Sequence, residues 1–457
     1  MTETLIETAP SQAIPLVRLT AADLSARLEG EPERTRNWIA ARGFRGKAGS
    51  HCVVPSESGE IEKVFAGLDA ATELWEGSRL GSSLPAGTYA VEGECPDPQL
   101  FALGWRLASY SFDRYRAAEK QPAPVLVAPE GCDAALARLE AEAIGLTRDL
   151  ITTPAADMGP DALAVAATKL AEEFGAAIEV TVGEDLLRDN YPVIHAVGRA
   201  AEVAPRLIDL RWGPESAPKI TLVGKGVCFD SGGLDLKPAG GMLLMKKDMG
   251  GAANVLGLAR MIMASELKLR LRVLIPAVEN SVAGNAMRPL DVLTSRSGRT
   301  IEVGNTDAEG RLVLQDALTE AASEEPEAIL DFATLTGAAR VALGTDLPAL
   351  FCNDEEMAAG ILLHGGQVED PLWRMPLFRP YRRQLDSSVA DLNNVSRERT
   401  GGAITAALFL EEFVDPVTPW AHIDLMAYNS GSRPGRPEGG EALGIRAVHA
   451  WLSAKYR

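Results

Sequence analysis

Short apolar runs alternate with amphipathic stretches from about residue 155 to the end of the chain. The apolar runs predict strands at Ala177–Val182, Lys219–Val223, Arg270–Ile275, Ala328–Phe332, Leu350–Cys352 and Ala421–Leu425. The amphipathic stretches predict helices at Ala162–Glu173, Gly250–Glu266, Leu312–Ser323, Glu355–His364, Ile404–Phe413 and Ile445–Ala454. Such alternation is typical of an α/β domain with a mostly parallel central sheet flanked by helices.

The first 130 residues show a weaker pattern of strands and helices, interrupted by Pro and Gly. Their expected elements are helices near Ala21–Leu28 and Glu31–Ala41 and strands at His51–Pro55 and Thr88–Glu92. A stretch rich in Ala, Leu and Glu, Cys132–Thr152, then has helical spacing and stops at Thr153-Pro154. We therefore expect two α/β domains: a variable N-terminal one over residues 1–130, a connecting helix over 131–154, and a catalytic one over 155–457.

Composition narrows the class of protein. A chain of 457 residues is long enough for two hydrophobic cores. The formal net charge of −18 argues against non-specific binding to nucleic acid or anionic membranes, and no apolar run is long enough to span a bilayer. No basic segment opens the chain, and its five cysteines are scattered without a CxxC pair. We therefore expect a cytoplasmic protein without a signal peptide or a disulfide framework.

Three glycine-rich segments concentrate charged residues: Gly224–Lys237, Lys246–Gly251 and Asn305–Leu312. They contain the carboxylates of Asp230, Asp248, Asp307 and Glu309 and the cations of Lys225, Lys237 and Arg311. Two of the segments adjoin a predicted strand or helix, where the active sites of parallel sheets lie. Carboxylates that converge on one cleft repel each other unless cations hold them, and hard divalent metal ions take such oxygen ligands. The segments therefore predict a metal-assisted hydrolase.

Each of these residues also has an ordinary interpretation. Asp248 can cap the helix that follows it, and Asp307 and Glu309 can cap the helix expected at Leu312. Lys225 and Lys237 can be surface lysines, and Arg311 can form a simple salt bridge. Lys225, however, lies at the end of an apolar run, where a buried lysine needs an anionic partner or must lose its proton.

Other hydrolase and nucleotide-binding motifs are absent from the sequence. The five histidines have no HExxH spacing and lie outside the charged segments, which disfavours a thermolysin-like zinc site and a dinuclear phosphoesterase. The chain has no Gly-x-Ser-x-Gly elbow and no GxxxxGK[ST] phosphate loop.

The charged segments resemble those of the leucyl aminopeptidases, also called cytosol aminopeptidases. The resemblance is carried by Val223–Ala253, Asn305–Leu312 and Ala333–Gly337, with support from Asp149–Ala155 and Gly401–Ala406. It covers roughly residues 100–450, which is the whole expected catalytic domain.

This resemblance implies a metallo-aminopeptidase with two divalent metal ions, Mn²⁺ or Zn²⁺, in each subunit. The implied metal ligands are Lys225, Asp230, Asp248, Asp307 and Glu309. Asp230 and Glu309 would bridge both ions, Asp307 would complete one site, and Lys225 and Asp248 would complete the other. Lys237 would help to polarise the scissile carbonyl, and Arg311 would hold a bicarbonate that acts as general base.

The same resemblance places Met245, Thr334 and Gly337 around the first side chain of the substrate. Because no cation is evident among these positions, we expect N-terminal Leu or Met to be preferred over acidic residues. The implied partners are peptides with a free N-terminus and further copies of the chain, in a homo-hexamer. A DNA-binding or architectural role of a peptidase-like hexamer is the alternative, disfavoured by the net charge but compatible with local basic pairs such as Arg382-Arg383.

Overall fold

The computed structural model describes residues 3–68, 73–116 and 122–457. The chain divides into two compact units. The first contains residues 1–145 together with 431–438, and the second contains residues 146–430 and 439–457. Helix α5 (Ala134–Thr152) includes the point at which the first unit passes into the second. Each unit has its own sheet and its own buried apolar core.

The first unit is built on a six-stranded sheet in the order β1-β6-β5-β2-β4-β3. Its strands are β1 (Leu5–Ile6), β2 (Ile14–Leu19), β3 (His51–Pro55), β4 (Ile61–Gly67), β5 (Thr88–Gly93) and β6 (Val125–Val127). All neighbours are parallel except β3 and β4. Its helices are α1 (Leu24–Glu29), α2 (Glu33–Ala41), α3 (Glu73–Ser83) and α4 (Pro98–Leu107).

The second unit is built on a nine-stranded sheet. Its strands are β7 (Ala177–Val182), β8 (Arg206–Trp212), β9 (Lys219–Gly224), β10 (Gly226–Asp230), β11 (Arg270–Asn280), β14 (Ala328–Ala333), β15 (Ala349–Cys352), β16 (Trp373–Arg374) and β18 (Trp420–Asp424). The central order β18-β14-β9-β11 is parallel, and β10 also runs parallel to β11. Antiparallel neighbours occur only outside this centre among the described residues, at β8, β7 and β15. The prediction of an α/β protein with a mostly parallel second sheet is confirmed.

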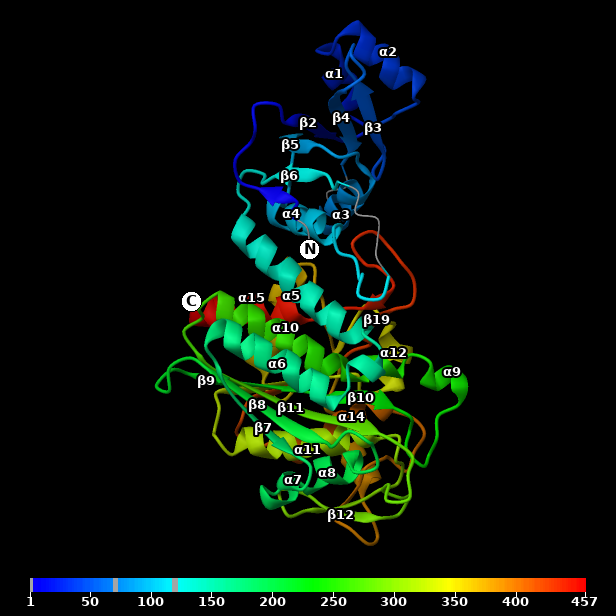
Figure 1. Cartoon of the computed structure of the whole chain (residues 1–457), viewed down its shortest axis with the longest axis vertical. Coiled ribbons are helices and arrows are strands. Elements are labelled where there is room, and N and C mark those ends of the chain that lie inside the picture. Colours follow the sequence, from blue (N-terminus) through cyan, green and yellow to red (C-terminus); the bar gives the residue numbers. More distant parts are fainter. Residues whose placement is uncertain (1–2, 69–72, 117–121) are drawn as a thin grey trace. The chain divides into compact units, whose positions relative to one another are not determined.

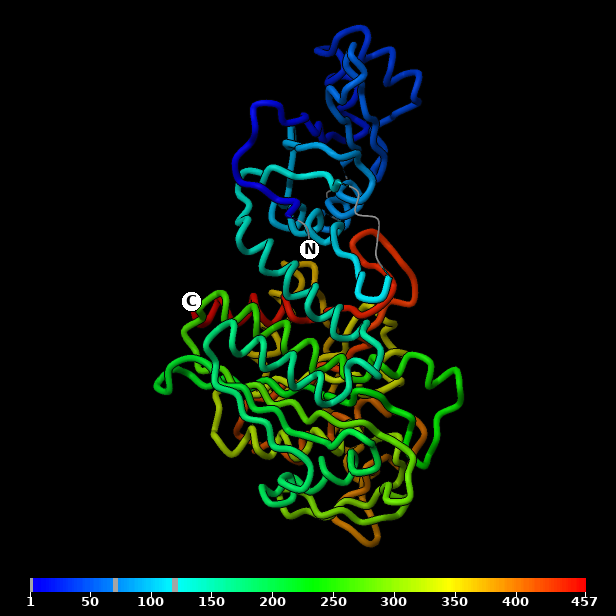
Figure 2. The backbone as a smooth tube through the Cα atoms, in the orientation of Figure 1, coloured from blue at the N-terminus to red at the C-terminus, as the bar shows by residue number. Residues whose placement is uncertain are grey.

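Helices cover both faces of the second sheet (Figure 1). One face is covered by α6 (Pro160–Phe174) and α10 (Gly250–Ala264), and the other by α8 (Pro192–Gly198), α11 (Glu309–Ala322) and α14 (Gly402–Glu411). Helix α15 (Ile445–Tyr456) runs beside α10, although the two are far apart in sequence (Figure 2). Val223, Leu274, Leu314, Phe409 and Trp420 belong to the buried core between the sheet and the α11 layer.

Short elements complete the second unit. Its remaining helices are η1 (Ala155–Asp157), α7 (Asp185–Arg188), α9 (Ala239–Met242), η2 (Met245–Met249), α12 (Gly337–Leu343), α13 (Glu355–Gln367) and η3 (Arg379–Leu385). Two small sheets are formed by β12 (Val292–Thr294), β13 (Thr300–Glu302) and β17 (Leu392–Asn393), and by β19 (Tyr428–Asn429) and β20 (Gly439–Gly440). In the described part of the chain, no helix combines the length and the apolar character needed to cross a bilayer.

Two differences from the expected elements affect the site. The strand expected to end at Ile275 continues through Pro276 to Asn280, although Pro lacks a backbone N–H. Helix α11 begins at Glu309 rather than at Leu312, so Glu309 is the first helical residue and not part of a preceding turn. These extensions bring the side chains of Asn280 and Glu309 to the same edge of the second sheet.

Candidate metal centre

The charged segments meet at the edge formed by the carboxyl ends of the parallel strands. Asp230 is the last residue of β10, Asp424 is the last of β18, and Lys225 and Thr334 directly follow β9 and β14. These four residues line a cavity of about 380 Å³. Since parallel strands end at the same edge of a sheet, the topology alone brings together residues up to two hundred positions apart.

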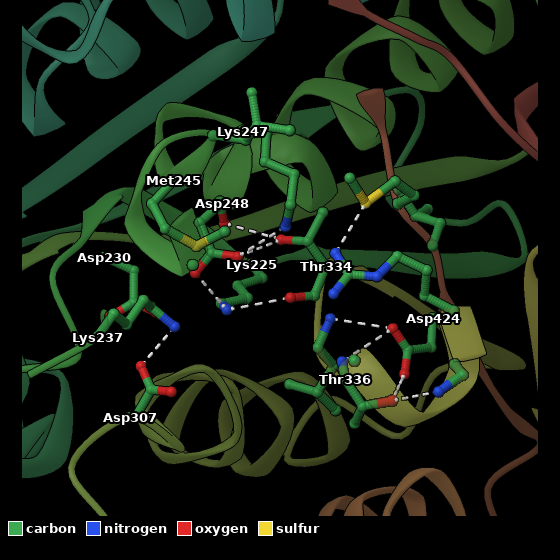
Figure 3. Close-up of a pocket in the computed structure, with 18 of the residues that line it drawn as sticks. Lys225, Asp230, Lys237, Met245, Lys247, Asp248, Asp307, Thr334, Thr336 and Asp424 are labelled. Atoms are coloured by element: carbon green, nitrogen blue, oxygen red, sulfur yellow. Dashed lines mark hydrogen bonds and ion pairs between the residues drawn. The ribbon is translucent and has the colours of Figure 1, made fainter. Parts of the chain in front are cut away.

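One side of the cavity is formed by Asp230, Lys237 and Asp307 (Figure 3). The Lys237 ammonium lies 2.7 Å from Asp230 Oδ2 and also pairs with Asp307 Oδ1. Asp230 Oδ1 accepts hydrogen bonds from the Gly232 N–H and from Asn280 Nδ2, both at 2.9 Å. Asp230 is therefore held in place from three directions, while the Asp307 side chain is 34% exposed.

A second, deeper group contains Lys225, Asp248 and Glu309. Lys225 Nζ lies 2.6 Å from Asp248 Oδ2 and 2.9 Å from Glu309 Oε1. It also donates to the carbonyl oxygen of Thr334 at 3.3 Å, and the Thr334 hydroxyl donates to Asp248 Oδ1 at 2.7 Å. Lys225, Asp248 and Glu309 are all buried, with residue exposures of 3%, 2% and 1%.

Two glycines make this packing sterically feasible. A Cβ on Gly310 would collide with the Lys225 side chain, and a Cβ on Gly251 would collide with the carbonyl of Phe332. Gly251 lies at the start of α10 and Gly310 near the start of α11, so both helices approach the strand ends with bare backbone. The glycines of the sequence motifs therefore serve close packing around Lys225.

The electrostatics of the deeper group are unequal. Burial lowers the pKa of Lys225, but the carboxylates of Asp248 and Glu309 outweigh burial and raise that pKa overall. Burial opposes the ionisation of Asp248, yet Lys225 and Lys247 together lower its pKa. The pKa of Glu309 is instead raised, first by burial and then by the neighbouring charge of Asp230. The nearby cations therefore do not offset the cost of ionising the buried Glu309 carboxyl.

This arrangement fits a divalent metal ion. Asp230, Asp307 and Glu309 each offer a carboxylate oxygen, and these oxygens lie within 4.8 Å of one another. All three are hard oxygen donors, as Mn²⁺, Mg²⁺ or Zn²⁺ can accept. Lys225 and Asp248 adjoin this group through the contact of Lys225 with Glu309. All five residues expected as ligands therefore lie together in the structure.

The capping alternatives are wrong for Asp248 and Glu309. Met249 rather than Asp248 occupies the position before α10, and the Asp248 side chain contacts Lys225 and Thr334. Ala308, whose side chain makes no capping hydrogen bond, occupies the position before α11. The carboxylates are instead directed at cations.

Arg311 lies next to this group but outside the walls of the cavity. It is buried, one guanidinium nitrogen donates to the carbonyl of Asn394 at 2.6 Å, and its Nε has no hydrogen-bond partner among the described residues. Burial lowers the pKa of Arg311 to about 10, although Glu309 and Asp424 oppose the shift. An unsatisfied, buried guanidinium nitrogen fits an additional anion such as bicarbonate.

The three residues expected around the first substrate side chain, Met245, Thr334 and Gly337, all line the cavity. Met245 begins the 3₁₀ helix η2, and Gly337 begins α12. Their positions place an apolar thioether and a side-chain-free backbone in the same wall.

Sequence reasoning missed several residues of this site. Asn280 and Asp424 both end strands, so the same strand-end argument that found Asp230 could have found them. Asp424 accepts hydrogen bonds from the backbone N–H groups of Leu335 and Thr336 and from the Thr336 hydroxyl (Figure 3). Two further cations of the cavity wall, Lys247 and Arg340, had no signal beyond their closeness to the motifs.

Comparison with family models matches both parts of the chain. Residues 145–449 match the catalytic domain of the cytosol aminopeptidase family, and residues 14–129 match the N-terminal domain of M17 aminopeptidases. A probable cytosol aminopeptidase of Syntrophotalea carbinolica is 42% identical over 385 residues, which cover 80% of this chain and 76% of that protein. Peptidase B of Pectobacterium atrosepticum is 43% identical over 311 residues, covering 66% of this chain and 71% of that protein.

Solved structures show the same similarity. The crystal structure of cytosol aminopeptidase from Coxiella burnetii has a TM-score of 0.95 and 47% sequence identity, covering 99% of this chain and 100% of that one. The bottromycin maturation enzyme BotP in complex with Mn has a TM-score of 0.87 and 34% identity, covering 97% of this chain and 99% of that one.

Proposed function

The chain belongs to the cytosol aminopeptidase family, whose members are metal-dependent aminopeptidases, and from this premise we propose that it removes N-terminal residues from peptides with two divalent metal ions. The observation that supports this proposal is the group of three carboxylates, from Asp230, Asp307 and Glu309, whose oxygens lie within 4.8 Å of one another. Asp230 and Asp307 line the cavity together with Lys225 and Asp248, and Glu309 contacts Lys225.

The proposed ligands divide between the two ions. Asp230 and Glu309 would hold both ions, Asp307 would help to hold one of them, and Lys225 and Asp248 would help to hold the other. The contacts of the two lysines support this division, because Lys237 lies between Asp230 and Asp307 while Lys225 lies between Asp248 and Glu309. Each ammonium thus occupies a position where carboxylate charge converges. Lys225 ligates only as a neutral amine, so it must release a proton when its ion binds.

When bound, the two ions supply an activated water molecule and a polarised scissile carbonyl. The residues of the chain provide the rest. Lys237, which lines the cavity, is placed to stabilise negative charge on the carbonyl oxygen of the substrate. Arg311 would hold a bicarbonate, which would supply a general base, and its Nε, which has no hydrogen-bond partner among the described residues, supports this role. Asn280 keeps Asp230 oriented through its amide.

The first residue of the substrate packs its side chain against Met245, Thr334 and Gly337. The flexible thioether of Met245 suits Leu- and Met-type side chains. We further propose Mn²⁺ or Zn²⁺ as the metal, a homo-hexamer as the assembly and the cytoplasm as the location. The nucleic-acid alternative lacks support at Arg382, because that residue pairs with Glu412 and Asp386.

The test combines metal counting with activity. Protein treated with a strong chelator is measured for metal content and for hydrolysis of Leu-p-nitroanilide, before and after addition of Mn²⁺ or Zn²⁺. We expect activity to vanish on chelation and to return with two bound ions in each chain. Glu309→Gln should lose metal and activity. Glu279→Gln is the matched control, since Glu279 is next to Asn280 on β11 but accepts from Ser281. Full activity of a verified metal-free protein would refute the proposal.

A further inference from the structure

Asn394 is a fully buried residue that lies outside the cavity wall. It directly follows β17, which pairs in parallel with β13, so it lies beside the chain that leaves β13. Its N–H donates to the carbonyl oxygen of Glu302 at 3.0 Å, which continues this pairing by one residue. Gly304 permits the close approach, because a Cβ there would collide with the side chain of Asn393. Asn394 is thereby placed against residues 304–308, although 86 to 90 positions separate the bonded residues.

The side-chain amide of Asn394 forms hydrogen bonds to the backbone of this segment with both of its polar atoms. Its Oδ1 accepts from the N–H groups of Gly304 at 2.8 Å and Asn305 at 3.2 Å. Its Nδ2 donates to the carbonyl oxygens of Asn305 at 2.8 Å and Ala308 at 3.3 Å. An amide has two hydrogens to donate and one oxygen with two lone pairs, so these bonds use its whole capacity. The amide therefore connects the two ends of the segment.

Asp307 lies inside the connected segment, which is neither helix nor strand. Because its side chain is 34% exposed, packing alone does not fix the position of its carboxylate. The backbone is fixed instead. The Asp307 N–H donates to Asn305 Oδ1 at 2.7 Å, and Asn394 bonds to Asn305 on one side and to Ala308 on the other. The place of the Asp307 carboxylate thus depends on the hydrogen bonds of Asn394.

The backbone carbonyl of Asn394 holds a second group of the site. It accepts from Arg311 Nη1 at 2.6 Å, and Arg311 is itself buried. One residue therefore contacts the segment that carries a proposed metal ligand and also the guanidinium that is proposed to hold the bicarbonate. A change of the Asn394 side chain would release the segment directly and would shift the carbonyl that orients Arg311.

We propose that Asn394 is a positioning residue, which sets the place of Asp307 in the metal centre and of the Arg311 guanidinium beside it. The inference rests on the proposed function and deepens it, because Asn394 acts through these two residues. Groups that orient metal ligands typically change metal affinity or activity by about 10–100-fold when they are removed. Since Asp307 is proposed to hold only one ion, the loss of affinity falls on that ion. The ion proposed for Lys225 and Asp248 is retained.

The experiment compares Asn394→Ser with Asn393→Ser, because a serine is uncharged but too short to connect both ends of the segment. Asn393 is the matched control, since this neighbouring asparagine donates to Glu302 and accepts from the Val395 N–H. We expect Asn394→Ser to weaken one of two Mn²⁺ ions by about tenfold or more in calorimetric titrations, and to lower kcat for Leu-p-nitroanilide by a similar factor. Anomalous diffraction identifies the weakened ion. Asn393→Ser should match the wild type in both affinities and in kcat.

A second variant covers the case in which Asn394→Ser does not fold. Asn394→Asp keeps the volume and the accepting oxygen, but an ionised carboxylate has no hydrogen to donate to the carbonyls of Asn305 and Ala308. It should weaken the same ion. Equal weakening of both ions, or unchanged affinity for both, would overturn the positioning role.

Hydrogen exchange of the metal-free proteins tests the contact without metal or substrate. The amides of residues 304–308 should exchange faster in the Asn394 variants than in wild type and in Asn393→Ser, because Asn394 Oδ1 accepts from two of these N–H groups. Unchanged exchange in this segment would also overturn the inference. If the Mn²⁺-loaded wild type does not hydrolyse the Leu anilide, the proposed function fails, while the two affinities and the exchange still decide the role of Asn394.

Discussion

Strand β11 and helix α11 each contribute to two charge clusters, one near either end of these elements. At the carboxyl end of β11, Asn280 holds Asp230 of the metal centre, and at the first residue of α11 Glu309 joins it. Near the start of β11, Arg272 pairs with Asp209 and with Glu320, which lies near the end of α11. Because the same two elements serve both clusters, the two groups of acidic and basic side chains can be compared directly.

The second cluster, here called the amino-end network, contains Asp209, Arg211, Arg272, Arg296, Glu320 and Glu324. It has three carboxylates and three guanidinium groups, and every member pairs with at least one of opposite charge. The metal centre has four carboxylates, and among the described residues two ammonium groups, those of Lys225 and Lys237, contact them within 3 Å.

This difference in charge balance distinguishes a cluster that stabilises the fold from a cluster that is suited to bind a cation. The arginines of the amino-end network lower the pKa of Asp209 against the effect of burial, so its ionised form is stabilised by the fold. Glu309 of the metal centre has a raised pKa, because burial and Asp230 disfavour its charge. A buried carboxylate that its own protein does not compensate is suited to an added cation. The comparison predicts that substitutions in the metal centre affect activity and that substitutions in the amino-end network affect stability.

The largest expected effect concerns the cations of the metal centre. Lys237→Ala and Arg311→Ala should each lower kcat by about 10²–10³, because each removes a preorganised positive charge that acts on the substrate or on the general base. Metal content, measured by plasma mass spectrometry, should stay close to that of the wild type. A wild-type kcat in both variants would remove them from the catalytic machinery.

The next effect concerns the amino-end network. Arg272→Met should lower the free energy of unfolding by about 3 kcal/mol, since it leaves buried carboxylates without their central partner. The metal content and kcat of the folded variant should not change. Arg211→Met serves as control, because that side chain is 37% exposed and should contribute less than about 1 kcal/mol. Urea titrations of the metal-free proteins measure both. Loss of metal in Arg272→Met would show that the two clusters are not independent.

A smaller effect distinguishes the two ions within the metal centre. Lys225→Met keeps the aliphatic stem but removes the nitrogen donor, so one ion should bind more weakly, by about tenfold or more, while the other is retained. Anomalous diffraction from crystals with titrated Mn²⁺ would show which ion is lost. If the variant retains both ions with unchanged affinity, Lys225 is a structural cation rather than a ligand.

The smallest effect is a pH dependence of opposite sign in the two clusters. Asp209 has a lowered pKa in the folded state, so its stabilising contribution is present above the ordinary aspartate pKa and is lost as the pH falls below it. Glu309 has a raised pKa, so the folded, metal-free protein holds its proton more tightly than the unfolded chain does. The stability of the metal-free protein should therefore fall as the pH rises above the ordinary glutamate pKa.

Unfolding free energies of wild type, Asp209→Asn and Glu309→Gln, measured from pH 2 to pH 8 without metal, test these signs. Glu309→Gln should reduce the decline of the unfolding free energy toward neutral pH. Asp209→Asn should reduce the loss of unfolding free energy in acid. Equal slopes in wild type and both variants would contradict the comparison. Saturating Mn²⁺ should remove the Glu309 effect from the wild type, because the bound cation stabilises the ionised carboxylate.

The sequence by itself determined the alternation of strands and helices in the second unit, and it identified the five proposed metal ligands, which the structure brings together. Strand β14 and the starts of β9 and β11 lie where the apolar runs predict them, because a buried parallel strand requires a continuous apolar run. Asp230 could be identified because it interrupts such a run at its end, and Lys225 because a lysine in that position needs compensation. In the first unit, by contrast, the sequence did not predict α3, whose periodicity Gly and polar residues obscure, or α4, which is buried over Leu100 to Leu107 and so has no extended polar face.

Only the tertiary structure decided which charges are compensated. Lys247 and Asp248 are neighbours in sequence, yet it is Lys225, 23 positions away, that makes the short contact with Asp248. Arg340 and Met426 come into contact only because β14 and β18 are adjacent in the sheet. Charge balance is a property of distances within a few ångströms, and these distances are set by the order and register of the strands rather than by spacing along the chain.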